Sequence, residues 1–463
     1  MDRIGGERTP GFKLLLTILV GLALTIPLFS VYLLSWDRQS QAREARQSIT
    51  AGWGGPQAMS GPVLVIPYRA NATETVVENG KSVTRTNHVT RELTLAPEAI
   101  ELSTEVKPDL RKRSIYKVVL YHARTSGKAR FAVPSDLART GVQPVDMDLS
   151  SAELRFGLSD ARGLGANARV LVGGRPLRLQ PGGGSSGGRG FFAWVDASGL
   201  MTQPIAVDFA YDFRGNEALS LAPQAGDTRW TVRSSWQNPS FGGDFLPNAR
   251  TVNAKGFDAA YRIGNLALGR SLVSTGDAPA AAAPTPATRD AEYARPTDGD
   301  SAQTAQISLI QPVDLYSQVD RATKYGFLFI GFTFLALLMF DVIGGVRVSA
   351  VEYLLMGAAL VLFFVLLLAF AEVIGFTLAY VLASAAIAGL NTAYSAAVLG
   401  SWRRAAFIGA LLVGLYAVLY ILLSLEAFSL LIGSLLLFAA LAGVMYATRS
   451  IDWSAKREQA QAT

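Results

Sequence analysis

The side chains that most often carry enzyme chemistry are scarce in this sequence. Its 463 residues include no cysteine and only two histidines, His88 and His122, which lie far apart. No ligand-spaced cluster such as a His-Glu-x-x-His helix surrounds either of them. The sequence therefore predicts no metal site, no cofactor and no disulfide, and each histidine is expected to be an ordinary strand or surface residue.

Paired carboxylates are the one catalytic device that needs neither cysteine nor histidine. The obvious pairs are Asp146 with Asp148 and Asp208 with Asp212. Residues two or four apart share one face of a strand by alternation, so a solvated polar face is the favoured interpretation. The Gly-rich residues 181–190 match fragments of nucleotide and hydrolase motifs without the strand-turn-helix context, which indicates chance. We expect no catalytic residues.

Binding is a second class of chemistry, and four aromatic residues could serve it. They are Trp230, Trp236, Phe241 and Phe245. A β-sandwich could present them to a glycan or to a partner protein. The alternative is a packed sandwich core, which is favoured because Trp and Phe are commonly buried.

Two acids at the ends of apolar segments, Glu372 and Glu426, are candidates for docking a large extramembrane domain. They are predicted to lie on the same side of the membrane as that domain, so they could pair with its arginines. The alternative is a pair of hydrated loop residues. A docking role requires partial burial, since an exposed ion pair contributes only about 0 to 1 kcal/mol.

Six apolar segments predict an integral membrane protein. The first, residues 14–34, has no charge, and a helix rising about 1.5 Å per residue needs roughly 20 such residues to cross the hydrocarbon core. Its length, with Tyr32 and Trp36 at its end, favours a signal anchor over a cleaved signal peptide. The later segments are residues 325–340, 353–371, a stretch within 373–402, 405–425 and 427–448.

Lys and Arg in the short connections predict that both termini are cytoplasmic, because cationic flanks are retained on that side. The net charge of +6 then reflects cytoplasmic membrane edges rather than binding to nucleic acid. The predicted regions are a cytoplasmic N-terminus at 1–12, transmembrane helix 1 at 13–36, a periplasmic β-rich domain at 37–324, a five-helix transmembrane bundle at 325–448 and a cytoplasmic tail at 449–463.

The exported domain is expected to consist mostly of strands. Residues 206–213 alternate apolar and acidic side chains with the period of two of a half-buried strand. Further strands are predicted at 61–67, 115–120, 128–133, 229–236 and 259–268, with a hairpin-like break at Ser126-Gly127. This pattern indicates one sandwich, or two subdomains divided at residues 181–190.

Residues 276–304, rich in Ala and Pro, have no apolar periodicity and are predicted to form a disordered loop. The fold class is therefore a membrane protein of α+β type. It has six transmembrane helices and a large β-rich, sandwich-like periplasmic domain between helices 1 and 2.

Six motifs spread over nearly the whole chain form a recognisable set. They read Arg-Ser-Ile-Tyr at 113–116, Leu-Ser-Asp-Ala-Arg-Gly-Leu at 158–164, Ser-Trp-Gln-Asn-Pro-Ser-Phe-Gly-Gly-Asp-Phe-Leu-Pro at 235–247, Gln-Pro-Val-Asp-Leu-Tyr at 311–316, Arg-Ala-Thr-Lys-Tyr-Gly-Phe-Leu-Phe-Ile at 321–330 and Ile-Asp-Trp at 451–453. The set resembles the CreD family of bacterial inner-membrane proteins. The resemblance implies a multipass protein tied to cell-envelope integrity, expressed under a two-component stress regulator and linked to colicin tolerance and β-lactam response. It implies no catalytic residues, and Val373 stands where the family tends to have a histidine.

Three functional classes remain open. The first is non-enzymatic maintenance of the cell envelope, the second a periplasmic glycan- or partner-binding module on a membrane anchor, and the third an exporter or flippase-like protein for an apolar molecule. No ionisable residue is predicted near the bilayer midplane, and Asp341 is expected at the cytoplasmic edge. The expected partners are membrane lipids and a periplasmic glycan or envelope protein, without nucleic acid.

Overall fold

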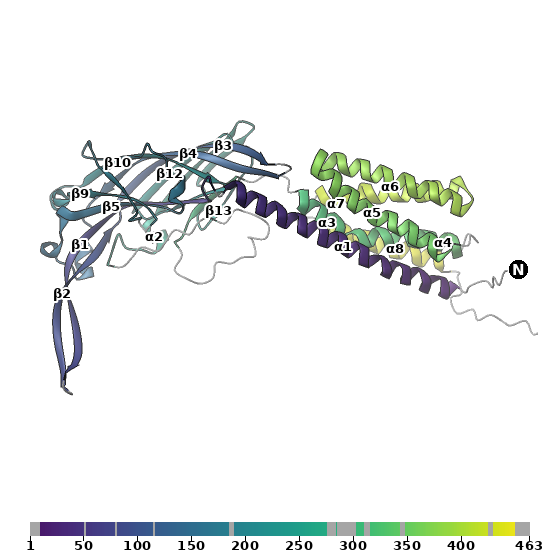
Figure 1. The fold of residues 1–463 in the computed structure, drawn as a ribbon, viewed down its shortest axis with the longest axis horizontal. Helices are drawn as coiled ribbons and strands as arrows, with labels where there is room; N and C mark the ends of the chain where they lie inside the picture. Colours follow the sequence, from purple (N-terminus) through teal and green to yellow (C-terminus); the bar gives the residue numbers. More distant parts are fainter. Residues whose placement is uncertain are drawn as a thin grey trace, which may run out of the picture. The chain divides into compact units, whose positions relative to one another are not determined.

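The computed structural model divides the chain into two compact units. One unit combines Met1–Arg43 with Val313–Thr463, and the other is Glu44–Pro312. Figure 1 shows that the first is helical and the second is built of strands. The structure describes residues 10–50, 52–78, 81–113, 116–184, 189–275, 284, 302–309, 315–342, 348–424 and 429–449.

The helical unit carries the apolar segments. Within the described ranges, five helices are long and apolar enough to cross a membrane, namely Gly11–Thr50, Gln318–Asp341, Ala350–Ile374, Phe376–Leu399 and Trp402–Leu423, and a shorter apolar stretch covers Gly433–Gly443. The helices are α1 (Pro10–Thr50, shared with the second unit), α3 (Leu315–Lys324), α4 (Gly326–Val342), α5 (Ala350–Ile374), α6 (Phe376–Leu399), α7 (Trp402–Ser424) and α8 (Ser429–Thr448).

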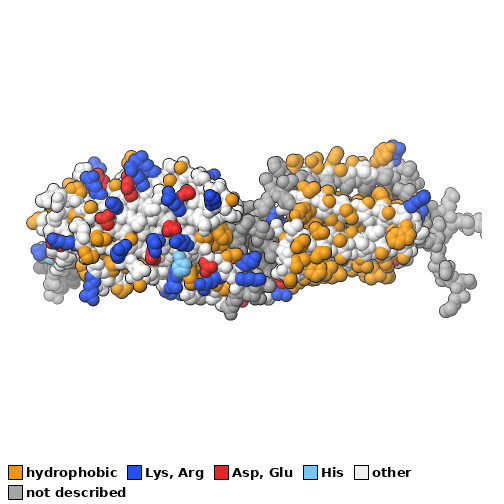
Figure 2. All heavy atoms as spheres, turned by 90° about the horizontal axis from the view of Figure 1, so that it is seen from above, with side chains coloured by type: hydrophobic (Ala, Val, Ile, Leu, Met, Phe, Trp, Pro, Cys, Tyr) orange, Lys and Arg blue, Asp and Glu red, His pale blue; other side chains and the backbone are white. Residues whose placement is uncertain are grey.

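The outer surface of these helices is apolar. Ile26 is 71% exposed and Leu378 is 62% exposed, and Figure 2 shows hydrophobic side chains spread over the visible face of this unit. A surface of this kind suits lipid rather than water, because soluble proteins rarely expose contiguous apolar patches. The chain is a membrane protein with helices and a large β-sheet domain.

Local signals set the helix ends within the bundle. The Ser349 hydroxyl accepts from the Glu352 N–H while the Glu352 carboxylate accepts from the Ser349 N–H, which forms a capping box at the start of α5. Gly375 at φ 85° separates α5 from α6, and Gly400 at φ 58° ends α6. Both positions need a positive φ, which glycine adopts without steric cost.

Helix α1 extends well beyond the predicted first span. The apolar run stops at Leu34, but the helix continues through a charged stretch to Thr50, where the Gln41 amide donates to the Asp37 carboxylate one turn away at 2.9 Å. Gln, Ala, Arg and Glu are good helix formers, so this stretch needs no apolar face to stay helical. The region boundary predicted at residue 37 therefore falls inside a helix, and α3 likewise makes residues 315–324, at the other end of the predicted periplasmic region, helical.

The second unit contains two sheets that pack face to face. The first sheet runs β13-β17-β11-β1-β5-β9-β8, with β2 on β1 and β16 on β2. Its strands are β1 (Gln57–Glu78), β2 (Lys81–Leu95), β5 (Ala152–Leu158), β8 (Leu179–Pro181), β9 (Gly190–Val195), β11 (Ala218–Ala222), β13 (Pro239–Gly243), β16 (Val273–Ser274) and β17 (Ala305–Leu309).

The second sheet, called sheet B below, runs β14-β15-β12-β3-β4-β10-β6-β7. Its strands are β3 (Ala99–Arg113), β4 (Tyr116–Phe131), β6 (Arg169–Val172), β7 (Arg175–Pro176), β10 (Ile205–Asn216), β12 (Asp227–Ser234), β14 (Ala249–Asn253) and β15 (Gly256–Gly264). A four-residue helix α2 (Asn265–Leu268) follows β15.

One hydrophobic core lies between the two sheets. Phe156 of β5 meets Phe209 of β10 with ring centroids 5.3 Å apart, and the Tyr121 hydroxyl on β4 donates to the Ala218 carbonyl on β11 at 2.8 Å. Residues on both sides of the Gly-rich segment belong to this core, and β8 pairs with β9 across it. The segment is therefore a connection within one sheet rather than a boundary between subdomains.

The hairpin break predicted at Ser126-Gly127 is wrong, because β4 passes straight through it. A Cβ on Gly127 would lie 2.6 Å from the Phe209 ring and 2.6 Å from the Glu101 carbonyl oxygen. Glycine is needed here to make room for a neighbouring aromatic ring and not to turn the chain. Of the predicted loop at 276–304, all but Pro284 and residues 302–304 lie outside the described residues.

Candidate functional site

Trp230 belongs to the sandwich core. Its side chain is 0% exposed, stacks on Tyr261 at 5.1 Å and donates its indole N–H to the Thr104 hydroxyl at 3.0 Å. The charged neighbours Arg229 and Arg233 point outward on the same strand. Trp230 is thus a packing residue with a satisfied donor, and its side chain is not presented to a ligand.

The other three predicted aromatic residues lie near one edge of the sandwich. Trp236, Phe241 and Phe245 are each half-buried and pack against the core. Phe241 meets Phe257 edge-on at 5.7 Å, and the Arg250 guanidinium lies 5.5 Å from its ring centroid. These three side chains are therefore partly exposed near one edge, whereas Trp230 is fully buried.

The motif that contains these aromatic residues fastens the returning chain. The Asp244 carboxylate accepts from the Thr304 N–H at 2.7 Å, while the Asp244 N–H donates to the Thr304 carbonyl at 2.7 Å. Gly243, at φ 81°, lies so close to Thr304 that a Cβ would clash with its carbonyl oxygen. This geometry explains Phe-Gly-Gly-Asp as a structural clamp on the segment that leads into β17.

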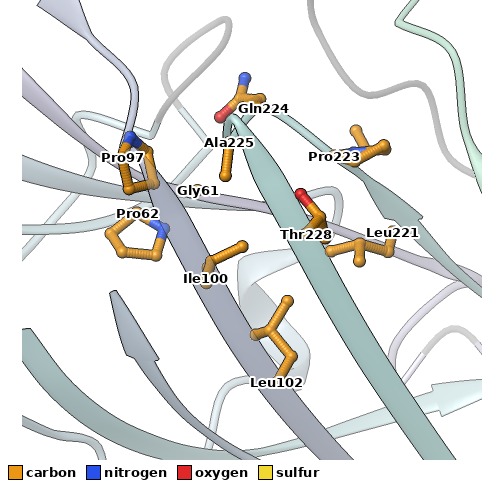
Figure 3. A pocket seen from close by; sticks show the side chains of 11 residues that line it. Gly61, Pro62, Pro97, Ile100, Leu102, Leu221, Pro223, Gln224, Ala225 and Thr228 are labelled. Carbon is orange, nitrogen blue, oxygen red and sulfur yellow. The ribbon is translucent and has the colours of Figure 1, made fainter. Parts of the chain in front are cut away.

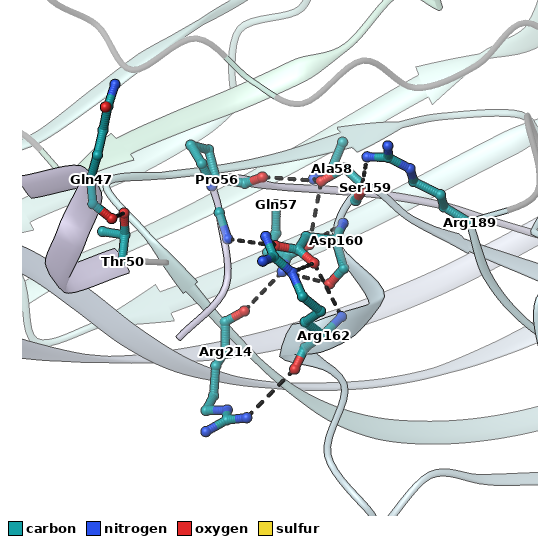
Figure 4. A network of polar contacts seen from close by, with 11 residues as sticks. Gln47, Thr50, Pro56, Gln57, Ala58, Ser159, Asp160, Arg162, Arg189 and Arg214 are labelled. Carbon is teal, nitrogen blue, oxygen red and sulfur yellow. Dashed lines mark hydrogen bonds and ion pairs between the residues drawn. The ribbon is translucent and has the colours of Figure 1, made fainter. Parts of the chain in front are cut away.

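A buried amide organises the start of the sandwich (Figure 4). Gln57 is 0% exposed, and its side-chain N–H₂ donates to the carbonyls of Asp160 and Arg214 at 3.0 and 2.9 Å. Its side-chain carbonyl accepts from the Asp160 N–H at 3.2 Å. The Ser159 hydroxyl accepts from the Ala58 N–H at 2.9 Å. The network ties the first residues of β1 to the Leu-Ser-Asp-Ala-Arg-Gly-Leu motif.

The Asp160 carboxylate is the electrostatic centre of this network. It accepts from the Gly55 N–H at 2.9 Å and from the Arg162 guanidinium at 2.9 and 2.8 Å. The Arg162 side chain lowers the pKa of Asp160 to about 2. Partial burial acts in the opposite direction, and the hydrogen bond from the Gly55 N–H adds to the lowering. A carboxyl group that stays ionised to such low pH does not suit general acid–base catalysis near neutrality.

Trp53 completes the junction that follows α1. The Arg111 and Arg214 guanidinium carbons lie 4.4 and 5.1 Å from its ring centroid, and His122 contacts it edge-on at 4.9 Å. Two stacked cations and an edge-on imidazole fix the indole by cation–π and aromatic contacts. His122 therefore has a packing role, and among the described residues no group of three His, Asp or Glu side chains could hold a metal ion.

The predicted acid pairs are engaged in solvated contacts. Asp208 lies 3.8 Å from Lys128 and Asp212 lies 3.0 Å from Arg124, both on the outward face of sheet B. Asp148 accepts from the Ser150 hydroxyl at 2.6 Å, which lowers its pKa. Asp208 and Asp212 thus lie on the outward face of a strand, as the sequence favoured, whereas Asp146 and Asp148 lie in and just after the short 3-10 helix Pro144–Asp146 rather than on a strand.

Two hollows in the described part of the β-rich unit differ greatly in size. The first lies beside Gly61, Pro62 and Ile100 (Figure 3) and measures about 10 Å³, close to the least that holds one water molecule. The second is an open hollow of about 610 Å³ on the outward face of sheet B, beside Ser103 and Ser126. Of these two, the second is large enough to receive an organic ligand.

Ion pairs fasten α1 within the helical unit at two points. The Lys13 ammonium donates to the Asp341 carboxylate of α4 at 2.7 Å, and Asp341 is only 3% exposed. Near the other end of α1, Arg38 lies 4.0 Å from Glu372 of α5. One contact of Glu372 is thus with α1 rather than with a strand, so a role in docking the β-rich domain stays a prediction. Glu426 lies outside the described residues.

Sequence reasoning missed Gln57, Trp53 and the burial of Asp341. The motif at 158–164 was a usable signal for the network, because it contains Ser159, Asp160 and Arg162.

Comparison with known proteins addresses the family. The family profile described as "Inner membrane protein CreD" matches residues 9–454. The chain belongs to the CreD family. It is also 31% identical over 438 residues to a protein of Escherichia coli (strain K12) described as "Inner membrane protein CreD", covering 94% of this chain and 91% of the relative. The resemblance drawn from the six motifs is confirmed. The fold, with several helices able to span a membrane, agrees with membership of a family of inner-membrane proteins.

Proposed function

We propose that this CreD-family protein is a non-enzymatic, multipass protein of the bacterial inner membrane that supports cell-envelope integrity under envelope stress, including exposure to β-lactams and colicins. Its β-rich domain would lie in the periplasm and both termini in the cytoplasm. The observation that carries the proposal is the joining of a large sandwich to a set of membrane helices by one unbroken helix, α1. Such a chain can present an exported surface while anchored in the membrane.

One observation favours a structural or binding role over chemistry, and a second supports the proposed topology. The strongest polar network of the sandwich, around Gln57 and Asp160, uses its donors and acceptors on the protein itself. The cationic residues near the described helix ends, Lys13, Arg403 and Arg404, support cytoplasmic placement of those ends.

Reporter fusions test the placement. Reporters fused within residues 276–304 should be active only if they are periplasmic in type, and reporters fused within 343–349 or after Arg449 only if they are cytoplasmic in type. A cytoplasmic signal from 276–304 would refute the periplasmic domain.

Complementation tests the role itself. A strain that lacks the gene should survive a β-lactam or colicin challenge less well, and the full-length chain should restore survival. A fusion that keeps α1 and the β-rich domain but lacks residues 326–448 serves as the comparison. Equal survival of the deletion strain and the complemented strain would refute the envelope role.

A further inference from the structure

The outward face of sheet B carries a row of small side chains that crosses the strands. Strand pairing aligns Ala210 with Ser126, Ser126 with Ser103, Ser103 with Thr231, and Thr231 with Ala260. Each residue shares the outward face with charged neighbours two positions away, because successive side chains alternate between faces. These five residues, called the floor below, come from β10, β4, β3, β12 and β15.

Two rows of charged side chains border the floor. The first charged row is Asp208, Lys128, Glu101 and Arg229, and the second is Asp212, Arg124, Glu105 and Arg233. Within the rows Arg229 pairs with Glu101 at 3.1 Å and Arg124 pairs with Asp212 at 3.0 Å. Across these four strands the signs alternate in each row, so that every acid stands between bases or beside one. On β15 the rows continue with Arg262 beside Arg229 and Asp258 beside Arg233.

The floor and the two charged rows together form a trough. The rows lie four residues apart along each strand, which is roughly 13 Å, and the floor crosses four strand spacings, roughly 19 Å. Long Lys, Arg and Glu side chains rise on both sides of short Ala, Ser and Thr side chains. The open hollow of about 610 Å³ lies over the floor and the first charged row. Figure 2 shows Lys and Arg mixed with Asp and Glu over this unit, with uncharged surface between them.

The charges and side-chain sizes of the trough favour some classes of ligand over others. The first and second charged rows each contain two acids and two bases, and Arg262 and Asp258 continue them on β15 with one charge of each sign. Arg169 of β6 aligns with Ala210 at the end of the floor and adds a single positive charge. With so small a net charge, the trough offers little field to attract a polyanion or a polycation. An extended peptide gains its affinity by pairing with a sheet edge, whereas the central strands β3, β4, β10 and β12 already have neighbours on both sides. The floor contains no large apolar side chain for a lipid tail.

We propose that the trough binds an uncharged, hydroxyl-rich glycan strand that lies across the strands of sheet B. Hydroxyl groups both donate and accept hydrogen bonds, and each Arg–carboxylate pair keeps N–H donors and oxygen lone pairs free beside one another. The hydroxyls of Ser103 and Ser126 add polar groups along the floor. This inference rests on the proposed periplasmic placement, since envelope glycans lie outside the cytoplasm.

The test is direct binding by the full-length protein in lipid nanodiscs. The probe is a β-1,4-linked N-acetylglucosamine hexasaccharide, measured by isothermal titration calorimetry. Ala210→Trp fills the floor, whereas Ala206→Trp places the same side chain on the same face of β10 beyond the first charged row. We expect Ala210→Trp to weaken binding by at least about tenfold and Ala206→Trp to leave it unchanged.

Salt and competing polymers sharpen the result. Binding of an uncharged glycan should change little between low and high salt, because exposed charges on the ligand are absent. Failure of the hexasaccharide to bind, equal weakening by both variants, or preference for polyglutamate with a steep salt dependence would each overturn the proposal. Purified protein binds without regard to membrane side, so this outcome is independent of the reporter fusions that test the proposed function.

Discussion

At the residue scale, the contribution of a polar side chain to the stability of the sandwich depends on how deeply it is buried and on which groups it bonds. Gln57 is fully buried and satisfies three backbone groups, so its loss would leave donors and acceptors without partners, each costing about 1 to 3 kcal/mol. Trp230 keeps its indole donor satisfied by Thr104. Both residues stabilise the domain from inside, whereas Arg124 and Asp212 meet in solvent.

Asp160→Asn should lower the free energy of unfolding by about 1 to 2 kcal/mol at neutral pH, because the ionised carboxylate holds Arg162 and the Gly55 N–H. The folded pKa of about 2 lies below the ordinary value of 3.8, so this stabilisation is present above the ordinary value and is lost as pH falls through 2. Thermal unfolding from pH 6 to pH 2 should show the two proteins converging at the acid end.

Asp109→Asn is the matched control, since Asp109 also pairs with the arginine two residues later, Arg111, at 3.1 Å. Its side chain is 48% exposed, against 14% for Asp160, so its loss should cost at most about 0.5 kcal/mol. Equal effects of the two substitutions would show that the buried network around Asp160 adds nothing.

At the element scale, α1 is held in the helical unit by two ion pairs of different character. Lys13 and Arg38 lie 25 positions apart on α1, roughly 37 Å along a helix, which approaches the thickness of a bilayer with its headgroups. The Asp341 pair is buried and short, whereas Glu372 lies 4.0 Å from an Arg38 side chain that is 43% exposed. We therefore expect the buried Lys13–Asp341 pair to contribute more to stability than the Arg38–Glu372 pair.

Lys13→Met should destabilise the detergent-solubilised protein by on the order of 3 kcal/mol, because it leaves the Asp341 carboxylate buried without its cation. The double variant Lys13→Met, Asp341→Leu should recover most of that loss, since no unpaired charge remains. Arg38→Gln serves as the comparison and should cost less than about 1 kcal/mol. Chemical unfolding monitored by fluorescence measures all three. A double variant as unstable as Lys13→Met would contradict the burial argument.

At the scale of the whole molecule, the chain leaves the sandwich at β16 and returns at β17. Both strands lie on the same side of β1. Thr94 of β2 lies between β16 and Val65 of β1, and Leu221 of β11 lies between β17 and Met59 of β1. Six residues along β1 separate those positions, roughly 20 Å. The connecting segment therefore has to cover a distance that six or more extended residues can span.

Replacing residues 276–301 with an eight-residue Gly-Ser linker should leave the unfolding temperature and membrane expression unchanged, because that segment has no apolar periodicity and its apolar side chains are, apart from Tyr293, small Ala and Pro. Removing the same residues without a linker should lower the unfolding temperature, since the remaining chain is too short to join β16 to β17 unstrained. Loss of expression with the linker would show that the segment itself packs.

The sequence by itself determined the membrane character of the chain and its strand-rich second part. Both follow from local physics, because a lipid-spanning helix needs about 20 apolar residues and a half-buried strand alternates. The six motifs also sufficed for the family. The alternation of Asp208 and Asp212 with apolar residues placed the start of β10 within one residue, although the strand continues three residues beyond the predicted end at Phe213.

Only the tertiary structure decided the features that depend on residues distant in the chain. Gly127 reads as a turn until Phe209 of another strand occupies the space beside it, and Asp341 reads as a solvated edge residue until Lys13, 328 positions away, pairs with it. The trough exists only through the register of five strands. Register, burial and ion pairing are properties of neighbours in space, which local composition does not encode.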